Sequence, residues 1–151
     1  MKPKLLLIIF YALINLGCVH QLKTENPRNE SITLQKSPKI ERIEITERTR
    51  GTNRSTVYAP FSKITLDNGQ KTTENISTAQ WKEIAKQAGL INLSKMPSFP
   101  SPTTGRFSDR ALISTLIITS EGKTYTSSSF DAGIPPKELE GLYILLKGKT
   151  E

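Results

Sequence analysis

Residues 111–130 read ALISTLIITSEGKTYTSSSF and form the most strand-like stretch of the chain. Apolar residues occupy neighbouring positions in 111–119, so apolar side chains fall on both faces, which predicts a central strand. Glu121 and Gly122 then indicate a turn, and residues 124–130 are predicted to return as an antiparallel partner. A hairpin is therefore expected, with residues 111–119 as the central strand of the sheet.

Upstream, residues 39–50 read KIERIEITERTR. Ile43 and Ile45 alternate with polar residues, which is typical of a strand with one buried face. Residues 51–55 are polar and are predicted to form a turn.

Residues 61–67 read FSKITLD and predict a second strand. Asn68 and Gly69 follow, and Asn-Gly is the strongest short hairpin signal. Residues 70–75 are therefore expected to return as a further strand, and their polar character predicts a sheet edge.

The first helix has clear boundaries. Ser77 is a predicted N-cap, and Gln80 three residues later completes a capping box. One face at helical spacing holds Trp81, Ile84, Ala85 and Ala88. Gly89 is predicted to end the helix in the left-handed conformation.

A second helix is expected after Pro135 and Pro136, since proline is tolerated in a first turn. Its apolar face would hold Leu139, Leu142, Tyr143 and Leu146. The predicted order is ββ(β)αββα. This order indicates an α+β domain over residues 39–151, an antiparallel sheet of four to five strands with two helices packed on one face.

The N-terminal segment, residues 1–18, reads MKPKLLLIIFYALINLGC. Lys2 and Lys4 precede a nearly continuous apolar run from 5 to 16. This run has the length of a secretory signal, about 7–15 residues, and is shorter than the about 20 needed to span a bilayer. Residues 1–17 are therefore predicted to be a signal peptide.

Gly17 followed by Cys18 resembles the lipobox of bacterial lipoproteins. The resemblance implies that the Cys18 thiol is lipidated, that residues 1–17 are removed, and that the new N-terminus is acylated. The alternative is a buried cysteine in an ordinary signal peptide or signal anchor. Val19, which is not the aspartate of inner-membrane retention, favours the outer over the inner membrane, with the domain periplasmic or surface-exposed.

Residues 18–38 are polar and are predicted to be a lipidated flexible tether. The single His20 lies there. One Cys and one His exclude an internal disulfide and a Cys/His zinc cluster. Loss of Lys2 and Lys4 lowers the net charge from +7 to +5, and the basic residues form no run, so no nucleic-acid partner is expected.

Residues from Ser77 onward resemble a family of small bacterial lipoproteins without an assigned activity. The resemblance rests on four features: the Trp81 helix, the Pro/Ser/Thr-rich loop 97–110, Arg106-x-x-Asp109-x-Ala111, and Phe130-Asp131-x-Gly133-x-Pro135. Ala132 stands where relatives often have a histidine. The resemblance implies a binding or structural protein of the envelope.

The candidate site consists of Arg106, Asp109, Arg110 and Asp131. The predicted hairpin would bring Asp109 and Asp131 to one end of the sheet, near Arg106. Two carboxylates beside an arginine suit an acid/base pair or a cation site. The alternative is an Arg–Asp ion pair that pins the long loop onto the sheet.

The expected function is a non-enzymatic binding or accessory module, anchored in membrane lipid through acylated Cys18 and serving an envelope protein partner. No catalytic residue, metal or cofactor is predicted. The expected contact surface is the sheet face opposite the helices, with Arg42, Glu44, Thr124, Thr126 and Ser128. Two alternatives remain. One is a small-ligand binder or enzyme that uses Asp109, Asp131 and Arg106; the other is an inhibitor of an envelope enzyme.

Overall fold

The structure, a computed structural model, describes residues 38–147. The predicted signal peptide, Cys18 and residues 19–37 of the predicted tether lie outside the described residues. The strands are β1 (Ile40–Thr49), β2 (Thr52–Ala59), β3 (Ser62–Asp67), β4 (Gln70–Asn75), β5 (Ile113–Ser120), β6 (Lys123–Thr126) and β7 (Phe130–Asp131). The helices are α2 (Thr78–Gly89) and α3 (Glu140–Lys147), with the 3-10 turns η1 (Leu93–Ser98), η2 (Gly105–Ser108) and η3 (Lys137–Leu139).

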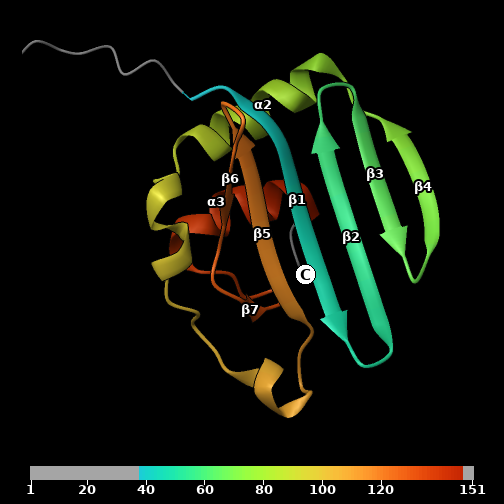
Figure 1. Cartoon of the computed structure of the whole chain (residues 1–151), viewed down its shortest axis with the longest axis vertical. Helices are drawn as coiled ribbons and strands as arrows, with labels where there is room; N and C mark the ends of the chain where they lie inside the picture. Colours follow the sequence, from blue (N-terminus) through green and yellow to red (C-terminus); the bar gives the residue numbers. More distant parts are fainter. Residues whose placement is uncertain (1–37, 148–151) are drawn as a thin grey trace, which may run out of the picture. The chain divides into compact units, whose positions relative to one another are not determined.

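The strands form one antiparallel sheet in the order β4-β3-β2-β1-β5-β6, and the short β7 pairs with the start of β5 (Figure 1). The predicted α+β class is therefore confirmed. The sheet has more strands than the four to five expected, because β2 and β7 are additional. Strand β5 is internal, as its apolar residues on both faces predicted, and β1 is internal as well.

Strand β2 is the largest difference from the prediction. The turn is confined to Arg50 and Gly51, and pairing with β1 already starts at Thr52. The polar start of β2 is satisfied by partners on neighbouring strands. Arg54 pairs with Asp67 at 2.6 Å, and the Ser55 hydroxyl donates to Glu44 at 2.5 Å. Such cross-strand pairs depend on distant residues, so the local sequence does not reveal them.

The β3–β4 hairpin is confirmed as predicted. Asn68 and Gly69 both have positive φ, 49° and 88°, which is the conformation of a two-residue type I′ turn. All six residues of β4 are exposed, so this strand forms a polar edge of the sheet.

Helix α2 begins as predicted but ends differently. The capping box is present: the Ser77 side chain accepts from the Gln80 amide, and the Gln80 side chain accepts from the Ser77 amide. The predicted left-handed Gly89 is wrong. Leu90 follows in right-handed conformation, φ −80°, and its amide bonds to the Gln87 carbonyl, so no left-handed residue is required.

The core lies between one face of the sheet and the two helices. Ile43 and Ile45 of β1 and Leu116 and Ile118 of β5 are almost fully buried. The helices cover them with Ile84, Ala88, Leu142, Tyr143 and Leu146. In Figure 1, α3 passes behind β5 and β1, and both helices are thus on one face as predicted.

The opposite face of the sheet is open. Strand β5 presents Ile113, which is 38% exposed, and the partly exposed Ile117 on this face, so its apolar side chains lie on both faces as predicted. Strand β6 is shorter than predicted. The chain leaves the ladder at Ser127, whose Oγ accepts from the Leu116 amide, and Ser128 then donates from its Oγ to the Phe99 carbonyl. Ser128 therefore supports the loop instead of joining the open face.

Candidate functional site

The predicted cluster is centred on Asp131, which lies in β7 opposite Ile113. Its carboxylate is buried, with the residue 2% exposed. Four donors converge on it: Thr103 Oγ1 at 2.6 Å, the Gly105 amide at 2.6 Å, the Arg106 amide at 3.0 Å and Arg106 Nη1 at 3.1 Å. All four come from the long loop, so one carboxylate fixes that loop against the sheet.

The Arg106 side chain completes this clamp. Its Nη1 also donates to Ser101 Oγ at 3.0 Å and to the Thr103 carbonyl at 2.6 Å. The guanidinium carbon lies 4.2 Å from the centroid of the Phe107 ring, a cation–π contact. The side chains of Arg106 and Asp131 are only 8% and 3% exposed, so the ion pair is shielded from water.

The environment of Asp131 favours its ionised form. Burial alone would raise the pKa of this carboxyl, but the hydrogen bonds from Thr103, Arg106 and Gly105 lower it to about 2. A carboxylate with such a pKa remains ionised at neutral pH and holds no proton to donate. Its four donors direct it toward the loop, which fits the ion-pair alternative for this cluster.

Asp109 and Arg110 lie apart from this clamp. Asp109 ends η2 in left-handed conformation, φ 54°, and both residues are exposed. Among the described residues, neither side chain makes an ion pair or hydrogen bond with Asp131. The structure thus brings Arg106 and Asp131 together and leaves the other two at the surface. Within residues 38–147, no group of three or more His, Cys, Asp or Glu is placed to hold a metal ion.

Sequence reasoning missed Thr103 and Gly105 as partners of Asp131. A Cβ added at Gly105 would lie 2.9 Å from Asp131 Oδ2, so only glycine lets the backbone approach the carboxylate this closely. The glycine in a loop rich in proline, serine and threonine is the one local signal of this approach. The partner of that glycine is 26 residues away and could not be read locally.

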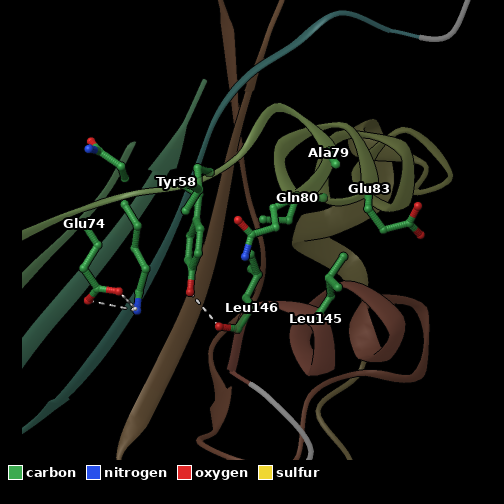
Figure 2. Close-up of a pocket in the computed structure, with 11 residues that line it drawn as sticks. Tyr58, Glu74, Ala79, Gln80, Glu83, Leu145 and Leu146 are labelled. Atoms are coloured by element: carbon green, nitrogen blue, oxygen red, sulfur yellow. Dashed lines mark hydrogen bonds and ion pairs between the residues drawn. The ribbon is translucent and has the colours of Figure 1, made fainter. Parts of the chain in front are cut away.

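A first groove, here the hairpin groove, lies between the β3–β4 hairpin and the two helices, with a volume of about 510 Å³. Figure 2 shows Tyr58 on one side and Gln80 and Glu83 of α2 on the other. Its lining consists of Tyr58, Lys63, Glu74, Asn75, Ile76, Ala79, Gln80, Glu83, Ile84, Leu145 and Leu146. The Tyr58 hydroxyl is committed to the Leu146 carbonyl at 2.6 Å, and Lys63 pairs with Glu74 at 3.2 Å.

A second groove, here the lysine groove, lies between the start of β1 and α2, with a volume of about 530 Å³. It is lined by Pro38, Lys39, Ile40, Trp81, Lys82, Ala85, Lys86, Gly89 and Leu90. Three of these residues are lysines and none is acidic. Trp81 and Ala85 pack against the core from this side of α2, which confirms that the predicted apolar face includes them.

The open face of the sheet carries a row of side chains that crosses all six main strands. In register order the row is Thr73, Ile64, Val57, Glu44, Ile117 and Thr126. Glu44 accepts from the Ser55 hydroxyl and pairs with Arg42 at 2.7 Å. Of the residues expected on this face, Arg42, Glu44, Thr124 and Thr126 lie on it, whereas Ser128 does not.

Comparison of the chain with protein-family models, with curated proteins and with solved structures found no match in any of the three. Neither helix of the described residues is long and apolar enough to cross a bilayer.

Proposed function

We propose that this chain is a lipoprotein of a bacterial envelope, anchored by acylation of Cys18, and that its domain is a non-enzymatic binding module for an envelope protein partner. Support for the anchor comes from the sequence of residues 1–18, where a basic start and a short apolar run lead to a single cysteine. The resemblance of the later part of the chain to small lipoproteins supports the same assignment.

The observation that carries the binding role is the open face of the sheet. Its transverse row contains Val57, Ile64 and Ile117, which are partly exposed, between threonines at both ends. β-Branched side chains have few rotamers, so they lose little conformational entropy when a partner covers them. A rigid surface of this kind suits a protein contact.

The geometry at Asp131 also supports a non-enzymatic role. Its oxygens are occupied by loop donors, and its pKa of about 2 removes it as a proton donor at neutral pH. The residue therefore has a structural task that accounts for its burial.

Two measurements test the proposal. The intact mass of the detergent-extracted protein should correspond to a chain that starts at a lipid-modified Cys18; any other start would refute the anchor. In cells, a photo-cross-linking residue at Thr73 or Thr126 should capture one partner of comparable abundance. The same residue at Glu138, which is exposed on η3 at the helix side of the domain, serves as the matched control. Equal capture at all three positions, or none, would refute the binding face.

A second candidate function, binding of a small ligand, is favoured by the hairpin groove. Its volume falls within the about 300–1,000 Å³ of ligand pockets. Lys63 already pairs with Glu74 there, so Glu83, beside the apolar Ile84 and Leu146, is the carboxylate that suits the cationic group of an amphipathic ligand. Native mass spectrometry of the protein purified from its host would reveal such a ligand as an added mass, which Glu83→Gln should weaken.

A further inference from the structure

The outward side of α2 combines exposed apolar and basic side chains along the lysine groove. Leu90, directly after the last residue of the helix, is 74% exposed. Trp81, one helical turn before Ala85, is partly exposed. Lys82 and Lys86 are four residues apart and therefore stand on the same side of the helix. The groove thus has an apolar floor with cations beside it.

All charged residues that line this groove are basic. Lys39, Lys82 and Lys86 are all exposed, and within the described part of the chain none of them pairs with a carboxylate. The hairpin groove, of similar volume, contains two carboxylates, Glu74 and Glu83, and its single lysine, Lys63, pairs with Glu74. Of the two grooves, only the lysine groove is suited to an anionic surface.

The position of the groove relates it to the N-terminal side of the chain. Pro38 and Lys39 line it, so the polypeptide that leads back toward Cys18 leaves the domain at this groove. The residues between Cys18 and Pro38 can span at most about 70 Å. Anchoring at Cys18 therefore keeps the groove within reach of the bilayer and raises its effective concentration there.

We propose that the lysine groove is the membrane-facing surface of the domain and docks on anionic lipid. Trp81 and Leu90 enter the headgroup region, while Lys39, Lys82 and Lys86 contact lipid phosphates. Tryptophan prefers this interfacial depth, and lysines extend their charge to the headgroups while their stems cover apolar surface. The inference rests on the proposed anchor at Cys18, which delivers the domain to the membrane.

The expected strength follows from the charges. Each lysine near an anionic surface shifts the docked-to-undocked ratio by about fivefold. Removal of all three should lower that ratio on the order of a hundredfold. Added salt should also lower the docked-to-undocked ratio, because the Debye length falls from about 10 Å at 0.1 M to about 3 Å at 1 M and the lysine charges are then screened.

The experiment uses the fluorescence of Trp81, which is the single tryptophan of the chain. The full chain is reconstituted into vesicles of phosphatidylcholine alone, or of equal parts phosphatidylcholine and phosphatidylglycerol. With phosphatidylglycerol present, Trp81 should be quenched by lipids that carry a spin label near the headgroup and protected from aqueous acrylamide. The variant K39Q/K82Q/K86Q should lose both effects, and the control K71Q/K95Q/K137Q, three exposed lysines elsewhere, should keep them.

Two outcomes would overturn the proposal. If Trp81 remains open to acrylamide in anionic vesicles while the protein floats with them, the anchor holds and the groove does not dock. If Trp81 is protected from acrylamide equally in both vesicle types, the anionic headgroups are not what the groove recognises. A separate measurement tests the anchor itself: an intact mass that shows Cys18 without acyl chains would refute the anchor and not the groove.

Discussion

The hydroxyl of Tyr58, near the end of β2, donates a 2.6 Å hydrogen bond to the carbonyl oxygen of Leu146 near the end of α3 (Figure 2). The last carbonyls of a helix have no partner within the helix. Tyr58 supplies one from a strand 88 residues away, and it thereby joins the sheet to the final helix.

Replacing Tyr58 with Phe should lower the free energy of unfolding by about 1–2 kcal/mol, because a buried carbonyl loses its donor. Urea denaturation with an unchanged slope would measure the loss. Tyr125→Phe is the control, since Tyr125 is partly exposed and no hydrogen bond of its hydroxyl is present in the described residues. Equal stability of the two variants would contradict the role of Tyr58.

The buried Tyr58 hydroxyl should also make the stability of the protein depend on pH in the alkaline range. Burial, with a smaller contribution from Glu74, raises the pKa of Tyr58 to about 12. The folded state thus holds this proton more tightly than the unfolded chain, whose tyrosines titrate near pH 10. The contribution is complete below about pH 10 and is lost as the pH rises toward 12. Wild type should lose more stability over this interval than Tyr58→Phe does; parallel pH curves would refute the assignment.

Asp131→Asn should lower the melting temperature by several degrees at pH 7, since the loop donors lose their charged acceptor. The folded pKa of about 2 lies below the unfolded value of about 3.9. This contribution is therefore present above about pH 4 and is lost as the pH falls toward 2. The gap between wild type and variant should close over that interval. Asp109→Asn, at an exposed site, should leave the melting temperature nearly unchanged, and a matching loss there would argue against the clamp.

Two glycines should respond to alanine with opposite signs. At Gly105 the new Cβ would lie 2.9 Å from Asp131 Oδ2, and four hydrogen bonds hold that carboxylate in place, so a loss of about 1–3 kcal/mol is expected. At Gly89 nothing lies within 4 Å, so alanine should raise helix stability by about 0.5–1 kcal/mol. Chemical denaturation of both variants compares the signs directly. A neutral Gly105→Ala would mean that the loop shifts freely.

The elements that were predicted correctly are those with local signals. Asn68 and Gly69 define their own turn, and Ser77 and Gln80 define their own cap within four residues. Strand β2 lacked such a signal, because its polar half is satisfied by Glu44 and Asp67 on other strands. The signal at Gly89 was misleading, since the chain continues in right-handed conformation at Leu90, whose amide donates to the Gln87 carbonyl.

The candidate site was predicted in part. Arg106 and Asp131 were singled out from sequence and do meet, because the β5–β7 pairing brings the end of the loop beside Asp131. The donors Thr103 and Gly105 depend on the path of a proline-rich loop, which no periodicity describes. The two grooves arise only when helices and strands pack, so no single segment could predict them.

Strand β1 is the first element after Pro38, and it lies between β2 and β5. Tension that reaches the domain from its N-terminal side therefore arrives at a strand held along both edges, from Ile43 to Thr49 by β2 and from Ile40 to Arg48 by β5. Antiparallel hydrogen bonds run perpendicular to the strand, so a pull along β1 loads them in shear and together. A domain attached in this way yields to mechanical force only when both ladders fail at once.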